Sequence, residues 1–435
     1  MPSTSPVLDD RLLLALLAPL FILPLIHPLG FIVAIALIPV GYAVVLGVQR
    51  GEIFLMLTLF APVLKSSPLN PIPPELDLTL LFYILFLVVT GLLFLFRKRT
   101  LPQLEMIDIP LIIFTLIVFV EYFNAPAHAH EYALTKLLRY LFFALPFFYF
   151  PRILIKVDFY RLNRIITILG SGICLSLFII YPNSYVMKSS GNTYLTVAAI
   201  AGIAMLFSAS NFVQEPRKYW KLLYLGCMTA DILLAFKTNS RGGILFSGLV
   251  VVVYFMIVFR TKHLLALFSM IFLTLITILT YILFPDFFTR FFFLFKQHKG
   301  PSLSTRFVVY KLALKLISQR WFTGIGLGGF SNYHFLKYPH NLILEIFVEH
   351  GIAGFLAFLG ILFGVVSKGI SAVRRRAISP TRVPYLLAAL FMFLFHMSSF
   401  GLESTRLLFF FGGCLVTFSS TSTENVPEIS HEHSK

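Results

Sequence analysis

Long apolar runs separated by short polar segments form the main pattern of this chain, and they recur from Leu12 to the last twenty residues. Many of them can cross a hydrocarbon core of about 30 Å. Spanning segments of this kind are helices, because every backbone polar group in lipid must be satisfied internally. The pattern therefore predicts an all-α polytopic membrane protein with about 12 to 14 transmembrane helices. The predicted spans are residues 11–26, 28–48, 52–64, 78–96, 109–122, 134–150, 163–181, 193–210, 218–236, 241–260, 263–284, 342–367, 384–398 and 402–418.

The polar segments between the runs predict the orientation. Basic residues gather in segments that all fall on one face of the membrane in this alternation, and positive-inside bias makes that face cytoplasmic. These segments are 97–99, 152–164, 217–221, 260–263 and 374–376. Both termini are then cytoplasmic, with residues 419–435 as a cytoplasmic tail. The first residues lack the basic region and cleavage site of a signal peptide, so we expect them to remain in the mature chain.

Composition supports a single integral membrane domain over residues 1–435. Hydrophobic residues make up 58% of the chain and charged residues 12%, against about 25% charged in soluble domains. No polar stretch is long enough to bury a core of its own. The three cysteines lie far apart in apolar runs without a CxxC pair, which favours buried thiols over a disulfide framework.

One long loop, residues 285–341, lies on the outer face and carries eight basic residues against one acidic residue, Asp286. Two explanations stay open. Long loops cross the membrane regardless of charge and basic loops bind anionic lipid, or the loop meets an anionic partner on the outer side.

Two elements are predicted inside this loop. Residues 304–321 predict an amphipathic helix at the membrane interface, capped by Ser304, with Val308, Val309, Leu312, Ala313, Leu316 and Ile317 forming its apolar stripe. The glycine-rich stretch "FTGIGLGGF" that follows lacks the Gly-Lys-Ser/Thr of a phosphate loop, so we expect it to allow close backbone packing.

Polar groups from widely separated parts of the chain gather at the outer ends of the predicted spans. These groups are Lys136, Arg139, Arg241, Arg306, His340, Asn341, Glu403 and Arg406. Their shared membrane level predicts one polar chamber at the outer leaflet. Arginine suits an anionic ligand there, because its planar fork binds phosphate through two hydrogen bonds and stays charged.

His340 is the outer group that titrates near neutrality, which makes it the predicted proton acceptor. Nearby arginines keep it neutral through charge repulsion. Asn341, Glu345 and Glu349 follow at a spacing of four residues, on one face of the helix that runs inward. They either support the base or pair with a basic group from another helix, and pairing is favoured for Glu349 because it lies roughly 12 Å below the helix start.

An acidic pair, Glu75 and Asp77, is the one candidate for a divalent ion, and no further ligands are evident in the sequence. The sequence therefore predicts no metal site and no cofactor.

The same segments resemble the O-antigen ligase and polymerase superfamily. That superfamily has a Ser-Arg-Gly stretch opening a helix, a long periplasmic loop, and a His-Asn-x-x-Leu-Glu helix ending in Glu-x-Gly-x-x-Gly. The matching segments are "SRGGILFSG" (240–248), "STRFVVY…RWFTGIGLGGFSNY" (304–333) and "HNLILEIFVEHGIAG" (340–354). In this sequence His350 fills the variable position between Glu349 and Gly351.

The resemblance implies a metal-independent, inverting glycosyltransferase of the GT-C type in the bacterial inner membrane. The donor would be a glycan on undecaprenyl diphosphate, and the acceptor lipid A–core, with no nucleic-acid partner. By motif, Arg241 and Arg306 would hold the diphosphate and His340 would accept the proton of the acceptor hydroxyl. Lys136 and Arg139 are added as phosphate contacts on position alone, and Asn341 and Glu345 as supports of the base.

Two alternatives remain. A repeat-unit polymerase of the same superfamily is the close one, although the basic outer loop suits the phosphorylated acceptor of a ligase. A transporter of lipid-linked sugars is the distant one, since transporters tend to place polar groups near the midplane and to carry internal repeats. Here the charges gather at the outer ends of the spans.

Overall fold

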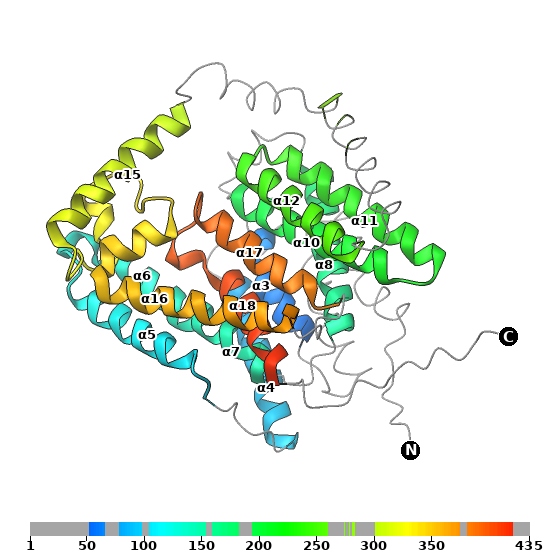
Figure 1. Cartoon of the computed structure of the whole chain (residues 1–435), viewed down its shortest axis with the longest axis horizontal. Helices are drawn as coiled ribbons and strands as arrows, with labels where there is room; N and C mark the ends of the chain where they lie inside the picture. The colour runs from blue at the N-terminus through cyan, green and yellow to red at the C-terminus, as the bar shows by residue number, and fades with distance from the viewer. Residues whose placement is uncertain are drawn as a thin grey trace.

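The computed structural model describes residues 52–65, 78–97, 104–153, 159–181, 194–259, 301–374 and 381–420, with four positions between 274 and 282. This part of the chain is helical, without strands (Figure 1). Its α-helices are α3 (Glu52–Lys65), α4 (Leu78–Arg97), α5 (Asp108–Phe123), α6 (His130–Arg139), α7 (Leu145–Ile153), α8 (Phe159–Ile180), α10 (Tyr194–Gln214), α11 (Lys218–Lys237), α12 (Arg241–Val258), α15 (Pro301–Arg320), α16 (Leu342–Arg374), α17 (Val383–His396) and α18 (Arg406–Ser420). Short turns are η1 (Ala127–Ala129), η2 (Tyr140–Ala144), η3 (Gly329–Asn332) and η4 (Leu402–Ser404).

The all-α polytopic fold is confirmed. Within the described ranges, six helical segments are long and apolar enough to cross a membrane: Ala127–Ile153, Phe159–Ile180, Tyr194–Gln214, Lys218–Lys237, Arg241–Val258 and Leu342–Ser371. Eleven of the predicted spans fall on helices, among them the shorter α17 and α18. The predicted spans 11–26 and 28–48, most of 263–284 and the tail 421–435 lie outside the described residues.

The first of these segments differs from a regular helix. It begins with the 3₁₀ turn η1 and changes from α to π geometry over η2 before α7 continues. Such π turns occur mostly as single turns within α-helices and often mark functional sites. The cavity described below lies beside the first half of this segment.

Helix α10 is the centre of one group of helices. In its apolar window 83% of the residues are buried, and it packs against α8, α11, α12 and α17. Small residues allow this closeness: a Cβ on Gly243 of α12 would lie 2.8 Å from the Cβ of Ala198 in α10. Because hydrocarbon gives little hydrophobic drive between helices, contact through small residues is the usual way to bring them together. The start of α12 is thereby held at a defined place.

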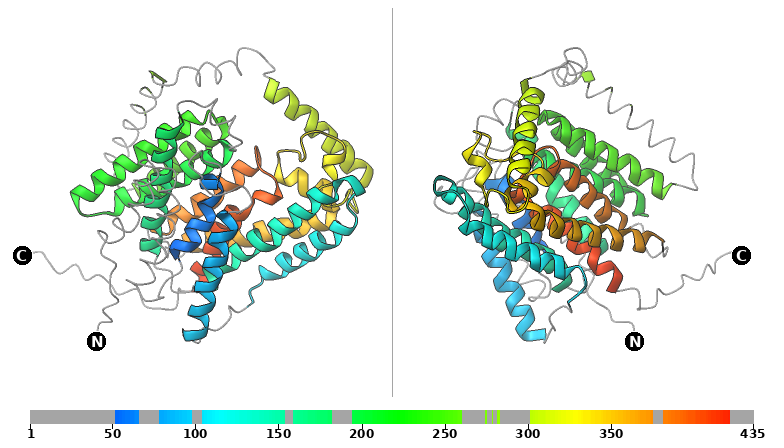
Figure 2. Two further views of the ribbon diagram at one scale, coloured as in Figure 1. Left: turned by 180° about the vertical axis from the view of Figure 1, so that it is seen from behind. Right: turned by 60° about the vertical axis from the view of Figure 1, so that its left-hand side comes forward.

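A second group contains α5, α6, α15 and α16, seen together on one side of the molecule in Figures 1 and 2. Helix α16 packs against α5, α15 and α18. It bends at Gly351, whose φ of 62° and ψ of −162° lie outside the helical region. Glycine reaches this conformation without a steric penalty. The bend leaves carbonyl groups of α16 without helical partners.

The glycine-rich turn after α15 satisfies these carbonyls. Ile325 N–H donates to Val348 O at 3.0 Å, and Gly326 N–H donates to Glu349 O at 3.1 Å. Gly326 has φ of 84°, and a Cβ there would lie 2.7 Å from the carbonyl carbon of Asn124. The sequence prediction of close backbone packing is confirmed for this turn.

We predict that Gly326→Ala destabilises the protein by roughly 1–2 kcal/mol, the cost of a left-handed non-glycine residue, plus the clash with Asn124. Gly248→Ala is the matched control, because a Cβ at Gly248 meets nothing within 4 Å and alanine favours a helix interior. The measurement is thermal unfolding of both variants in detergent. Equal unfolding midpoints would contradict the role given to the turn.

The structure corrects two details of α15. The helix starts at Pro301 and not at Ser304, which fits the preference of proline for the first helical turn. Val309 and Ala313 of the predicted stripe are buried against Phe330 and Val348, so this part of the stripe faces the protein. Val308, predicted in the stripe, is 59% exposed.

Candidate active site

His340 lies just before α16 and is held in a defined orientation. Its Nδ1 lies 3.0 Å from the carbonyl oxygen of Ser399, in the loop after α17. Since a carbonyl oxygen only accepts hydrogen bonds, Nδ1 must carry the proton, and Nε2 of the neutral ring keeps its lone pair. The ring of Tyr338 lies against the imidazole with centroids 4.4 Å apart. This tautomer is the one that a base acting through Nε2 requires.

Two residues of the described chain other than glycine have positive φ, Asn239 at 59° and His340 at 57°. Left-handed backbone of this kind costs of order 1–3 kcal/mol and gathers at functional sites. Asn239 stands two residues before Arg241, and His340 is the predicted base. Both strained positions therefore coincide with the two segments that the sequence selected for chemistry.

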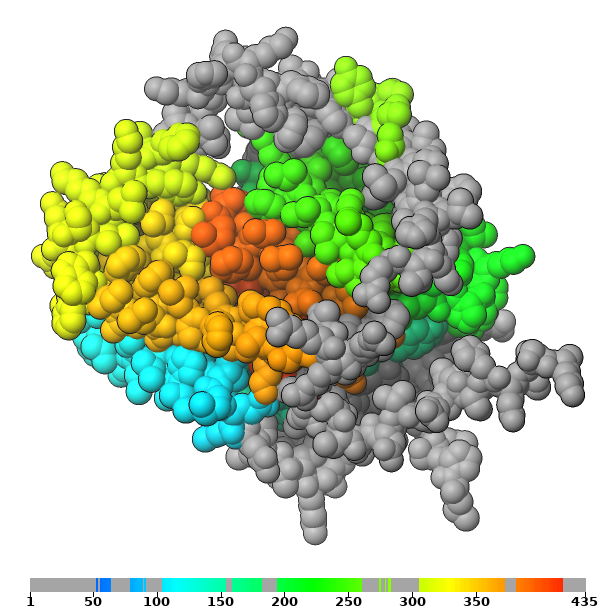
Figure 3. Space-filling model, in the orientation of Figure 1, coloured from blue at the N-terminus to red at the C-terminus, as the bar shows by residue number. Residues whose placement is uncertain are grey.

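The loop after α17 joins these two segments. A Cβ on Gly242, in the first turn of α12, would lie 3.2 Å from Ser398 Oγ, and the next residue, Ser399, accepts the hydrogen bond from His340. Ser240 caps α12 by accepting Gly243 N–H at 3.3 Å. The positive end of the α12 dipole therefore points toward this loop. In Figure 3 the orange-red surface of α17 and the segment after it lies between α12, in green, and α15, in yellow-green.

Burial and the charges around His340 favour the neutral form of its imidazole. Burial lowers the pKa of the imidazole from its usual 6.5, and the positive charge of Arg306 lowers it further, against the opposing effects of the Ser399 hydrogen bond and the Glu403 carboxylate. An uncharged, basic Nε2 at neutral pH results. The structure thus brings Arg306 and Glu403 close enough to influence His340, although they come from different helices.

Asn341 supports the same loop. Its Oδ1 accepts Leu344 N–H at 3.0 Å, which caps the start of α16, and its Nδ2 donates to Met397 O at 3.3 Å. The predicted supporting role of Asn341 thus takes the form of a clamp between α16 and the loop that holds His340.

Lys136 occupies a different place from the one predicted. It is fully buried and forms ion pairs with Glu345 and, at 2.6 Å, with Glu349. Glu345 also accepts Leu402 N–H at 3.2 Å, and Glu349 accepts Gly328 N–H at 3.0 Å. A lysine held inside the protein by two carboxylates is not available to a diphosphate, so we withdraw it from the predicted phosphate contacts. Glu345 and Glu349 thus pair with a basic group from another helix, one of the two roles that the sequence left open for them. Glu345 also holds the η4 turn through Leu402 N–H.

We predict that Lys136→Met destabilises the protein by roughly 3–5 kcal/mol, because it leaves two buried carboxylates without their counter-charge. Adding Glu349→Gln to the variant should recover part of the loss. The exposed Lys311 gives the control Lys311→Met. Thermal unfolding in detergent measures all three, and a Lys136→Met midpoint equal to that of the control would contradict the structural role.

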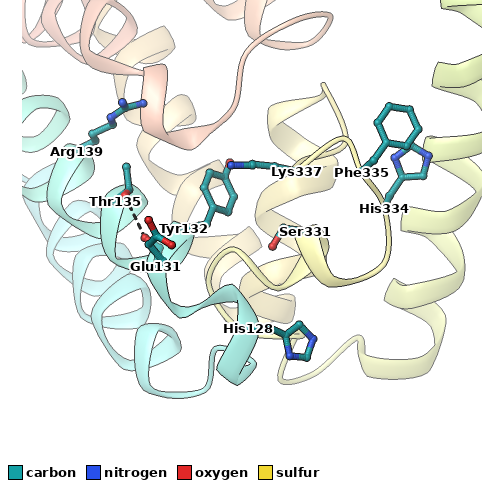
Figure 4. A pocket seen from close by; sticks show the side chains of 9 residues that line it. All are labelled: His128, Glu131, Tyr132, Thr135, Arg139, Ser331, His334, Phe335 and Lys337. Carbon is teal, nitrogen blue, oxygen red and sulfur yellow. Dashed lines mark hydrogen bonds between the residues drawn. The ribbon is translucent and has the colours of Figure 1, made fainter. Parts of the chain in front are cut away.

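Arg139 is exposed and lines a cavity of about 460 Å³ between α6 and the loop 331–337. Figure 4 shows this cavity with its side chains. The lining residues are His128, Glu131, Tyr132, Thr135, Arg139, Ser331, His334, Phe335 and Lys337. Arg241 is not among the residues that line this cavity. Helix α12, which Arg241 opens, packs against α10 and α17.

Several residues of this region were missed by the sequence analysis. Ser399 and Tyr338 position His340, and His334 and Phe335 form one wall of the cavity. The aromatic residues around "HFLKYPH" were a usable signal, because exposed aromatic residues before a predicted base are typical of ligand contacts. Ser399 acts through its backbone carbonyl, which no sequence pattern reveals. Glu75 and Asp77 lie outside the described residues.

A multi-pass helical membrane protein with a polar site at the ends of its helices is the class that these observations define. Residues 226–359 match the family model described as O-antigen ligase, which confirms the predicted resemblance to the O-antigen ligase superfamily. The matched region contains Arg241, Arg306 and His340. Members of this family are glycosyltransferase-like enzymes that use a lipid-linked glycan and a lipid acceptor. No curated protein matches the chain.

Proposed function

We propose that the protein is an O-antigen ligase-like glycosyltransferase that moves a glycan from undecaprenyl diphosphate to a lipid A–core acceptor. The observation that carries the proposal is the tautomer of His340, whose Nδ1–H is donated to Ser399 O at 3.0 Å. A basic Nε2 on His340 and a capped helix start bearing Arg241, both beside the loop after α17, support a base and an anion-binding group.

The reaction follows from these roles. An acceptor hydroxyl gives its proton to His340 Nε2 while its oxygen attacks the anomeric carbon of the donor sugar. The bond between that carbon and the phosphate oxygen breaks on the opposite face, which inverts the configuration. The electron pair leaves with undecaprenyl diphosphate. Arg241, Arg306 and the positive end of the α12 dipole stabilise the charge as it develops, the usual main source of such catalysis.

The orientation belongs to the same proposal. Basic loops place both termini in the cytoplasm of a bacterial inner membrane, and the active site then faces the periplasm, where lipid-linked glycans are presented. Residues 285–341, with α15 inside them, form the periplasmic loop. Repeat-unit polymerase is the alternative activity.

A gel of lipopolysaccharide from a deletion strain distinguishes the ligase activity from the polymerase activity. Core without O-chain, together with accumulated polymerised lipid-linked glycan, identifies a ligase. Core bearing a single repeat unit identifies a polymerase. Unchanged lipopolysaccharide contradicts both and moves the protein to another surface glycan or another class.

We also predict that the purified enzyme transfers glycan at an unchanged rate in excess chelator, because arginines and a helix dipole neutralise the leaving diphosphate in this mechanism. The measurement is the transfer rate with and without EDTA, followed by added Mg²⁺ or Mn²⁺. Loss of activity that either ion restores would support the alternative of a metal site at Glu75 and Asp77.

A further inference from the structure

We infer that the cavity beside α6 binds a negatively charged sugar unit of the acceptor glycan and so selects the acceptor. Its volume, about 460 Å³, lies within the range of roughly 300–1,000 Å³ of small-molecule sites. The assignment of this sugar to the acceptor rests on the proposed function. The binding of a charged sugar follows from the cavity itself.

The walls provide faces for a sugar ring. Phe335 is 80% exposed, yet its ring is fixed by stacking on His334, with centroids 4.4 Å apart and 30° between the planes. His334 is fixed in turn, because its Nδ1 accepts Leu336 N–H at 3.0 Å. The C–H faces of pyranose rings carry partial positive charge and pack on the negative faces of aromatic rings. An aromatic ring held open toward a polar cavity is therefore suited to a sugar.

The hydrogen bond at His334 also defines a donor. Since Nδ1 accepts, the proton of the neutral imidazole lies on Nε2. Thr135 and Ser331 add hydroxyl groups to the lining, and Glu131 adds a carboxylate acceptor. Mixed donors and acceptors around an aromatic wall match the alternating hydroxyl groups of a sugar.

The charge balance of the lining favours an anion. Arg139 and Lys337 supply two permanent positive charges, against one carboxylate from Glu131. Lys337 is held over the Tyr132 ring, with Nζ 5.3 Å from the centroid. An arginine fork recognises phosphate or carboxylate through paired hydrogen bonds. A sugar bearing either group would offer a partner to the cations of this lining.

Position in the chain assigns the sugar to the acceptor. Lys337, which lines the cavity, stands three residues before His340, so their Cα atoms lie within roughly 10 Å of each other. The diphosphate-binding candidate Arg241 opens α12, and it is not among the residues that line the cavity. In the proposed function a sugar held beside Lys337 is therefore assigned to the acceptor, whose hydroxyl must reach His340.

Binding is tested by saturation-transfer NMR on the full-length protein in nanodiscs, with glucose 6-phosphate, glucuronate, glucose and inorganic phosphate as probes. We expect both charged sugars to bind and glucose to bind about tenfold more weakly, as loss of a charge-assisted hydrogen bond implies. Phosphate should bind weakly, because it has no ring to stack. Arg139→Gln and Phe335→Ala should each weaken binding of the charged sugars about tenfold.

Two controls are matched in exposure and chemistry. Phe363 is 76% exposed on α16, away from the cavity, and Lys315 is an exposed cation of α15. Phe363→Ala and Lys315→Gln should leave binding unchanged. Equal binding of glucose and the charged sugars, or wild-type binding by Arg139→Gln and Phe335→Ala, overturns the inference.

Kinetics separate this inference from the proposed function. In the transfer assay Arg139→Gln should raise KM for the acceptor about tenfold, with kcat and the donor KM nearly unchanged. A rise in the donor KM alone would overturn the assignment to the acceptor. Because the NMR assay needs no turnover, charged sugars that bind to a protein without transferase activity would contradict the proposed function and leave the binding site standing.

Discussion

Replacing His340 by alanine is expected to lower glycan transfer by roughly 10²- to 10⁴-fold, the usual contribution of a general base. The acceptor hydroxyl would lose the group that takes its proton, while the diphosphate-binding residues remain. The protein should stay folded, since His340 is only partly buried and its one side-chain hydrogen bond here is to Ser399. The measurement is single-turnover transfer with purified enzyme and a lipid-linked donor.

His340→Asn is the sharper control. Asparagine tolerates the left-handed backbone found at this position, and its amide N–H can still donate to Ser399 O, but it has no basic nitrogen. It should unfold at the wild-type temperature and be as inactive as the alanine variant. Near-normal transfer by either variant would contradict the assignment of His340 as the base.

The pH dependence of transfer also tests the role of His340 as the base. Transfer needs neutral His340, and burial together with Arg306 lowers its pKa below the usual 6.5. Activity should therefore be constant near neutrality and fall only as the pH drops through this lowered pKa. The Glu403 carboxylate raises the pKa, so Glu403→Gln should move the acidic limb of kcat/KM to lower pH. A shift to higher pH would contradict the electrostatic role of Glu403.

Arg241→Ala is expected to reduce kcat by roughly 10²- to 10³-fold, as found when one group that stabilises developing negative charge is removed. In the proposed mechanism Arg241, which opens α12, and the dipole of that helix act on the same anion. Arg241→Lys should recover only part of the rate, because an ammonium cannot form the paired hydrogen bonds of a guanidinium. Rates and the donor KM are measured together.

The control for charge alone is Lys315→Gln, which removes an exposed cation of α15. It should change kcat less than twofold, or about 0.4 kcal/mol, at moderate ionic strength, where exposed charges are screened. If Arg241→Ala matches this control, or if its thermal unfolding midpoint falls far below that of wild type, the proposed contact with diphosphate is wrong.

Much of the fold was predictable, because the apolar length of each membrane span is a local property of the sequence. The predicted span 241–260 and the observed α12 (Arg241–Val258) differ by two residues at one end. The bend at Gly351 was not predicted, because it depends on the turn at Gly324 to Gly328 supplying N–H groups from elsewhere in the chain. Backbone partners of this kind leave no periodic signal.

For the site, residue chemistry selected segments of the sequence but did not reveal the partners of their side chains. Lys136 and Arg139 stand three residues apart on one helix and looked equivalent in the sequence. The structure gives them opposite environments: Lys136 is buried between two glutamates, and Arg139 lines an open cavity. The difference comes from what surrounds each side chain: the two glutamates of α16 at Lys136, and the cavity at Arg139.

The sequence by itself determined the all-helical membrane class, the start of α12 and the polar opening of α16, because apolar length, helix caps and ionisable side chains are local properties. Tertiary structure alone decided which nitrogen of His340 is free, which cation pairs with Glu345 and Glu349, and where a sugar-sized cavity lies. Those properties depend on contacts between residues far apart in the chain, such as His340 with Ser399 and Lys136 with Glu349, and such contacts exist only once the helices pack.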